Sequence, residues 1–173
     1  MANPIVLLSG PVGAGKTTVV RELVNLWPGR ALACIEGDTF WGFFAKSDAR
    51  GPTYPKFKTM MQAMVAAAVQ FAERSPVIVD FSIPPWFLED ARRIAEIGSV
   101  PLDYVVLRPS EGVCAQRAAT RSLGVIEDYA PYRELYRDFD AATAHMVGDD
   151  TTAANEVAHR ILRGVESGDF RVR

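Results

Sequence analysis

The feature that most constrains the fold of this chain is a glycine-rich segment near residue 10. It follows the apolar run 5–8 and leads into residues whose apolar positions recur at helical spacing. A buried strand that enters a glycine-rich turn and then a helix is the context that the pattern G-x-x-x-x-G-K-[ST] requires for phosphate binding. Glycines let the backbone curl around an anion, and the N–H groups of the loop and of the first helical turn point at it. We therefore predict a phosphate-binding loop made of Gly10-Pro11-Val12-Gly13-Ala14-Gly15-Lys16-Thr17, with Thr18 added from the helix.

Three side chains near this loop are suited to a nucleoside triphosphate and its magnesium ion. We expect Lys16 to reach the terminal phosphates and the Thr17 hydroxyl to bind Mg²⁺, which prefers oxygen ligands. Asp80 closes the apolar run 77–79, and a carboxylate in that position beside a phosphate loop can hold Mg²⁺ through water. The alternative for Asp80 is that it caps the turn that follows.

Strand and helix patterns alternate along the chain. The strand candidates are near-continuous apolar runs, which is typical of a parallel sheet that is covered on both faces. We predict an α/β fold, a three-layer α/β/α sandwich with a parallel sheet of about five strands. No linker or repeat interrupts the pattern, so a single domain is expected over residues 1–173. The strands are expected at 5–8, 31–35, 77–81, 102–107 and, weakly, 144–147, and the residues from 167 onward are expected to fray.

Composition limits the classes of partner and compartment. The formal net charge of -2 gives no electrostatic footprint for a nucleic-acid backbone, which argues against a nucleic-acid partner. The two cysteines, Cys34 and Cys114, lack metal-ligand spacing, and we expect both to be buried thiols in a reducing compartment. The longest apolar stretch, 60–72, is too short to span a bilayer, and no signal-peptide pattern is present. These patterns predict a cytoplasmic protein without a membrane partner, and its oligomeric state stays open.

A second carboxylate follows the second predicted strand. In open α/β sheets, ligands bind beyond the carboxyl ends of the strands, which is where Asp38 is expected. A kinase needs a group that orients the attacking hydroxyl or takes its proton, and Asp38 could serve as this group. Gly37 would let the backbone approach closely there. The alternative is that Asp38 caps a helix starting at Thr39. Whether Asp38 or Asp80 is the general base stays open.

Two arginines lie on one face of a helix expected over 110–122. Arg117 and Arg121 are four residues apart and precede a glycine-containing connection, 124–132, that resembles a lid. Arginines on a lid can neutralise charge on a transferring phosphoryl group and exclude water. Arg117 could instead pair with Glu111 or Glu127.

Two further groups of side chains each allow two interpretations. An aromatic cluster could line an acceptor pocket, but such clusters more often belong to the core; its members are Phe40, Trp41, Phe43 and Phe44. A basic group could contact an acidic acceptor or could form a solvated face; its members are Arg50, Lys56 and Lys58.

With the motif at residues 10–17, Asp38 and Asp80, the chain resembles the P-loop small-molecule kinases, particularly chloramphenicol phosphotransferase, gluconate kinase and shikimate kinase. The resemblance implies a P-loop NTPase fold, ATP and Mg²⁺ as cofactors, and a small-molecule hydroxyl acceptor. It implies that Asp38 touches the acceptor hydroxyl, that Arg117 is the lid arginine with Arg121 next, and that the turn 148–150 packs on adenine.

The chain also departs from these kinases. Gluconate kinases tend to have a histidine beside the aspartate that matches Asp38, and this chain has none there. The segment 121–124 also lacks their arginine-rich pattern. No arginine triad for a shikimate carboxylate is visible, so the acceptor is not identified, and neither is the choice between ATP and GTP. The main hypothesis is an ATP-dependent kinase that acts on a small-molecule hydroxyl. The alternatives are a nucleotide-binding switch ATPase without small-molecule turnover and, against the charge balance, a nucleic-acid end kinase.

Overall fold

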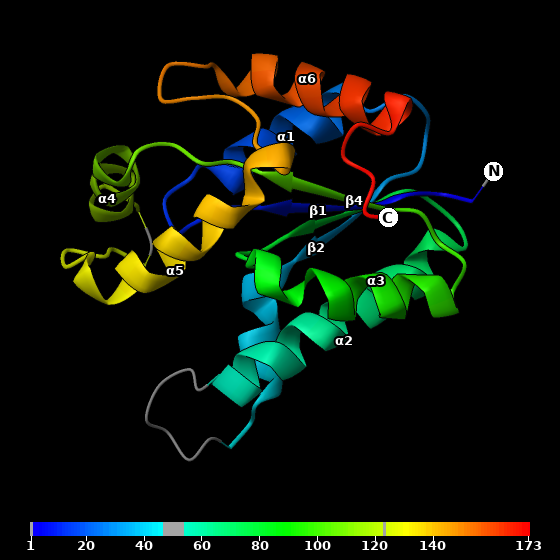
Figure 1. Ribbon diagram of the computed structural model, residues 1–173, viewed down its shortest axis with the longest axis horizontal. Coiled ribbons are helices and arrows are strands. Elements are labelled where there is room, and N and C mark those ends of the chain that lie inside the picture. The colour runs from blue at the N-terminus through cyan, green and yellow to red at the C-terminus, as the bar shows by residue number, and fades with distance from the viewer. Residues whose placement is uncertain (1, 47–53, 123) are drawn as a thin grey trace.

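Four parallel strands form the centre of the fold, in the order β2-β3-β1-β4. The computed structural model describes residues 2–46, 54–122 and 124–173. Helices α1 and α6 cover one face of the sheet and α2 and α3 cover the other, which gives the predicted three layers (Figure 1). The strands are β1 (Ile5–Ser9), β2 (Ala33–Glu36), β3 (Val77–Asp80) and β4 (Leu102–Val106), and the four helices are α1 (Lys16–Leu26), α2 (Tyr54–Ala72), α3 (Leu88–Ile97) and α6 (Ala154–Ser167).

The remaining helical segments surround the carboxyl ends of the strands. Helix α4 (Glu111–Ala119) and helix α5 (Arg133–Asp138) lie beyond the end of β4 (Figure 1). Four short 3₁₀ segments complete the chain: η1 (Gly37–Phe43), η2 (Pro85–Phe87), η3 (Ala130–Tyr132) and η4 (Phe139–His145). The residues predicted at strand ends therefore lie at the same end of the sheet as α4 and α5.

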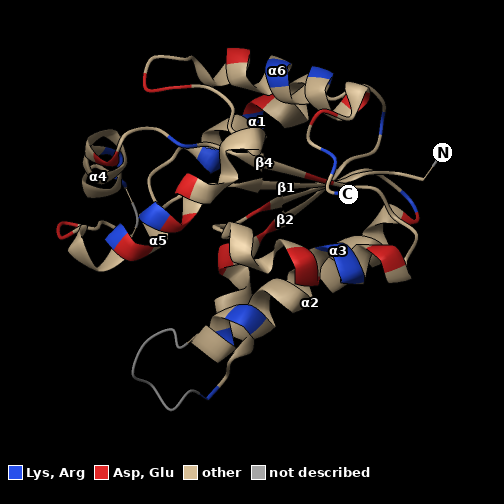
Figure 2. Ribbon diagram, viewed as in Figure 1, with Lys and Arg blue, Asp and Glu red and all other residues tan. Residues whose placement is uncertain are grey.

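The apolar strands are buried as predicted. All residues of β1 and β4 are buried, and their side chains alternate between two apolar clusters on opposite faces of the sheet. Met60 and Met64 from α2 fill the first cluster, and Leu23 from α1 with Ile161 from α6 fill the second. Charged residues of both signs are interspersed over the helices and are rare in the strands (Figure 2). Burial of both sheet faces explains why these strands tolerate few polar residues.

The prediction of a fifth strand over 144–147 is wrong. Among the described residues only an isolated parallel bridge forms there, between Val106 and Met146, and the Val147 N–H donates to the Val106 carbonyl at 2.9 Å. The preceding residues belong to the 3₁₀ segment η4, which ends at His145. Only two residues of this run are therefore left in extended conformation before the turn at Gly148.

The prediction that the C-terminal residues fray is also wrong. The Val172 N–H donates to the Leu102 carbonyl at 2.9 Å, so the last segment runs along the free edge of β4. Arg171 pairs with Asp103 at 2.9 Å, and Asp103 is 0% exposed. A buried carboxylate needs a cationic partner, and this requirement fixes the end of the chain.

The two thiols differ in burial. Cys114 is buried, as predicted, but Cys34 is exposed. The prediction fails for Cys34 because β2 is an edge strand, and only Ile35 of its four residues is buried. No helix in the described part of the chain is both long enough and apolar enough to cross a membrane.

Candidate functional site

The predicted phosphate loop connects β1 to α1 and packs closely on α4. Gly13 and Gly15 have positive φ angles of 82° and 94°. A Cβ atom on Gly13 would lie 2.1 Å from the carbonyl oxygen of Cys114, so no larger residue fits there. Backbone conformation and close packing together therefore require glycine in this turn.

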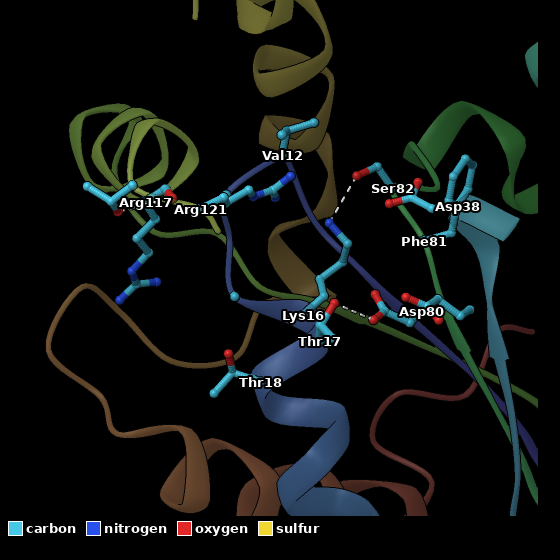
Figure 3. Close-up of a pocket in the computed structure, with 14 residues that line it drawn as sticks. Val12, Lys16, Thr17, Thr18, Asp38, Asp80, Phe81, Ser82, Arg117 and Arg121 are labelled. Atoms are coloured by element: carbon cyan, nitrogen blue, oxygen red, sulfur yellow. Dashed lines mark hydrogen bonds between the residues drawn. The ribbon is translucent and has the colours of Figure 1, made fainter. Parts of the chain in front are cut away.

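Lys16 lies at the end of the loop, between Arg121 on one side and Asp38 and Asp80 on the other (Figure 3). Its ammonium group donates to the carbonyls of Gly10 and Pro11, each at 3.1 Å, and to the Ser82 hydroxyl at 3.0 Å. Burial lowers the pKa of Lys16, while the carboxylates of Asp80 and Asp38 act in the opposite direction. The lysine is thus held where a terminal phosphate bound to the loop would meet it.

Asp80 and Thr17 form the second polar contact of the loop. The Thr17 hydroxyl donates to the Asp80 carboxylate at 2.8 Å. Burial raises the pKa of Asp80, and the charge of Lys16 and the hydrogen bond from Thr17 partly offset that rise. Asp80 thus contacts the loop, as the metal-binding interpretation requires.

These two oxygen groups fit a magnesium ion. Within the described residues, no group of three or more His, Cys, Asp or Glu side chains could hold a metal by itself. Mg²⁺ does not need such a cage, because it usually keeps several waters and takes other ligands from substrate phosphates. Thr17 and Asp80 beside a phosphate loop are therefore a sufficient protein contribution.

The end of β2 places two more carboxylates in the same cavity. Glu36 and Asp38 line it together with Asp80, and its volume is about 470 Å³. Glu36 takes the N-cap position of η1, so Asp38 is not the predicted helix cap. A Cβ on Gly37 would lie 2.6 Å from the Phe81 ring, which accounts for the glycine between the two carboxylates.

The predicted arginines line the opposite side of this cavity (Figure 3). Arg117 donates to the Ala14 carbonyl in the loop at 3.3 Å. Its suggested partner Glu111 pairs instead with Arg133, at 2.7 Å. Arg121 follows α4, which ends at Ala119 and is shorter than predicted. Arg117 thus supports the loop, and Arg121 faces the space beside Lys16.

A second cavity of about 240 Å³ lies next to the first and shares Gly15, Thr18 and Arg117 with it. Of the turn 148–150, Gly148 and Asp149 line this cavity. Hydrogen bonds from Thr151 and Thr152 lower the pKa of Asp149 to about 2. The rest of the lining is mainly apolar: Val19, Leu107, Pro109, Val147, Ala154 and Val157, with Arg108 beside them.

Sequence reasoning missed several residues of the site. Glu36 and Ser82 line the first cavity, and both adjoin a strand end, so their position was a usable signal. Tyr129 donates to the Val12 carbonyl at 2.7 Å and supports the loop from outside the cavity. No local pattern connects Tyr129 with Val12, because they are 117 residues apart.

The aromatic and basic groups do not line either cavity within the described residues. Phe40, Trp41 and Phe44 pack against the core, as the packing interpretation predicts, but Phe43 is 77% exposed. The remaining members are occupied elsewhere or not described: Lys56 lies over the Trp41 and Phe44 rings, Lys58 pairs with Asp90 at 2.6 Å, and Arg50 lies outside the described residues.

Solved structures similar to this chain include several kinases. APS kinase from Mycobacterium tuberculosis, in complex with AMPPNP and APS, has a TM-score of 0.72 at 16% identity, over 95% of this chain and 98% of that one. A gluconokinase from Sinorhizobium meliloti has a TM-score of 0.67 at 20% identity, over 96% of this chain and 93% of that one. Shikimate kinase from Acinetobacter baumannii, in complex with shikimate, has a TM-score of 0.65 at 22% identity, over 96% and 94%.

These identities establish a shared fold, which is the predicted P-loop α/β fold. No curated protein sequence matches the chain. A family model described as an AAA domain matches residues 5–135, which include the loop, both carboxylate strand ends and the two arginines. The chain therefore belongs to this AAA-domain family of P-loop proteins.

Proposed function

We propose that this protein is an ATP-dependent phosphotransferase that moves the γ-phosphate to a hydroxyl group of a small molecule. The observation that carries the proposal is the composition of one cavity. Lys16 and Thr17 of the phosphate loop, the carboxylates of Asp38 and Asp80, and Arg121 all line the same space of about 470 Å³. Phosphoryl transfer is catalysed mainly by positioning and by charge stabilisation, and these residues supply both.

The nucleotide is proposed to occupy both cavities. The loop residues 10–18 would hold the triphosphate through backbone N–H groups, with Lys16 on the terminal phosphates. The base would lie in the second cavity, against Pro109, Val147 and Gly148. A protein of the same fold, the APS kinase, is known in complex with AMPPNP and APS, which supports a nucleotide and an acceptor in adjacent positions.

Thr17 and Asp80 are the residues that would hold Mg²⁺. When bound, the ion would neutralise charge on the β- and γ-phosphates. Asp80 hydrogen-bonds Thr17, so its carboxylate is already directed at the loop.

Asp38 is proposed to orient the acceptor hydroxyl and to take its proton as the new O–P bond forms and the bond to ADP breaks. Arg121 would stabilise charge on the transferring phosphoryl group, and Arg117 would do so less directly because it also contacts the Ala14 carbonyl. A proton acceptor on one side and cations on the other fit an in-line transfer.

The test is to incubate the protein with Mg²⁺, ATP and a panel of metabolites and antibiotics that carry hydroxyl groups, and to measure ADP release. We expect acceptor-dependent ADP with the wild type. Asp38→Asn should reduce kcat about 10²- to 10⁴-fold and leave ATP affinity nearly unchanged. ATP binding without acceptor-dependent ADP would contradict the proposal and favour a nucleotide-dependent switch.

A further inference from the structure

The first cavity has two sides of opposite charge. On the α4 side are Arg117 and Arg121, and on the sheet side are Asp38 and Asp80, with Lys16 between them (Figure 3). Glu36 adds a third carboxylate to the sheet side. The cations therefore lie on the side where the phosphates of a nucleotide would bind, and Asp38 and Glu36 place negative charge where an acceptor would enter.

Two of the three cations of this cavity, Lys16 and Arg117, are bound to the loop, and Arg121 faces the space beside Lys16. Lys16 donates to two loop carbonyls and to Ser82, and Arg117 donates to the Ala14 carbonyl. Within the described residues, the sheet side contributes no Lys, Arg or His to the cavity; besides the three carboxylates it supplies Phe81 and Ser82. A carboxylate or phosphate on an acceptor would thus meet like charges there.

Glu36 is the carboxylate that the transfer reaction leaves without a role. Asp38 is assigned to the hydroxyl and Asp80 to the metal, but Glu36 is exposed at the end of β2 with its side chain in the cavity lining. Asp38, Asp80 and Glu36 line the same cavity, so their charges act together on a molecule that is bound there. A like charge about 5 Å away weakens binding about fourfold even in water, and an opposite charge strengthens it as much.

We infer that the acceptor is a hydroxyl compound without an anionic group, and that Glu36 sets this preference and favours an acceptor with a protonated amine. The inference rests on the proposed function, because it concerns the acceptor of that same reaction. An amino alcohol or an amino sugar has the charge and the hydroxyl groups that this inference requires.

The first experiment sorts the hydroxyl panel by charge and includes the matched set D-gluconate, D-glucitol and D-glucamine. The readout is kcat/KM from acceptor-dependent ADP release. The inference predicts that the best acceptor in the panel is neutral or cationic. A best acceptor that is anionic would overturn the inference and leave the proposed function intact. No acceptor-dependent ADP with any member, while ATP still binds, would overturn both.

The second experiment tests Glu36 itself with the best acceptor and its analogues of other charge. Glu36→Lys should raise the ratio of kcat/KM for the anionic over the neutral analogue about tenfold, through KM more than kcat. Glu73→Lys makes the same charge change at an exposed position outside the cavity, and it should leave the ratio unchanged. An equal ratio in the wild type and Glu36→Lys, with both proteins folded by circular dichroism, would contradict the role of Glu36.

Discussion

The two sides of the cavity are built in different ways. The loop side is formed by the phosphate loop and α4, and the acceptor side is the sheet side with its carboxylates. The loop is held through its own backbone. Gly13 lies against the Cys114 carbonyl, and the side chains of Tyr129 and Arg117 donate to carbonyl groups of the loop.

The acceptor side has the exposed carboxylates of Glu36, at the end of the edge strand β2, and of Asp38, in η1. Backbone contacts allow little variation, whereas exposed side chains can change without disturbing the core. The loop side should therefore tolerate fewer substitutions than the acceptor side.

The largest expected effect separates the two arginines on the α4 side. Arg121→Ala should lower kcat about 10²- to 10³-fold, because it removes a cation that acts on the transferring phosphoryl group. Arg117→Ala should mainly weaken ATP binding, because Arg117 supports the loop at Ala14. Steady-state kinetics with ATP varied would separate kcat from KM. The same effect of both variants on KM alone would contradict the division of roles.

Two glycines test whether the loop is the less tolerant side. Gly13→Ala should cost about 2–3 kcal/mol of folding free energy, because a positive φ angle and a contact with backbone both oppose a Cβ. Gly42→Ala is the matched change in η1, the segment that carries Asp38 on the acceptor side. A Cβ at Gly42 would meet nothing within 4 Å. Urea denaturation measures both. Equal costs at the two positions would remove the distinction between the two sides.

Tyr129 provides a smaller test of the loop. Tyr129→Phe removes the hydrogen bond to the Val12 carbonyl, which should cost about 1 kcal/mol of stability and weaken ATP binding a few-fold. Tyr132→Phe is the control, since the two rings are 5.9 Å apart but, among the residues that the structure describes, the Tyr132 side chain makes no hydrogen bond to the loop. Thermal denaturation and ATP titration would check both variants. Identical behaviour would show that the Tyr129 hydroxyl is not needed.

The smallest effect is a pH dependence of metal binding. Burial raises the pKa of Asp80 above its usual value of 3.8. Because the folded-state pKa is raised, protonation favours the folded state, and the contribution of Asp80 to stability is lost as pH rises through that pKa. The affinity for Mg²⁺ changes with pH in the opposite direction, because the ion binds the deprotonated carboxylate of Asp80. Titrating Mg²⁺ into the ATP complex should give weaker binding as pH falls, beginning above pH 3.8. Asp80→Asn should remove the part of this dependence that does not come from protonation of the nucleotide phosphates, and an unchanged dependence would contradict the assignment.

Sequence patterns predicted the parts of the site that are local in the chain. The loop is one continuous motif, and Asp38 and Asp80 follow apolar strands whose carboxyl ends share an edge of the sheet. The contact between Tyr129 and Val12 and the pairing of Asp103 with Arg171 join distant segments, and no periodicity reports such contacts.

Two other errors have separate physical causes. Alternating patterns predict a parallel sheet but not which strand lies at its edge. Cys34 was expected to be buried, and it is exposed because β2 is the edge strand. The run 144–147 was expected to add a strand, but 3₁₀ turns occupy its first half.

The most direct test of the account is a calorimetric titration of Mg²⁺-ATP into the wild type, Lys16→Met and Asp38→Asn, each checked for folding. The account predicts that the wild type and Asp38→Asn bind with similar affinity, because Asp38 lies on the acceptor side, and that Lys16→Met binds far more weakly. The absence of binding heat with the wild type, or a loss in Asp38→Asn equal to that in Lys16→Met, would contradict it.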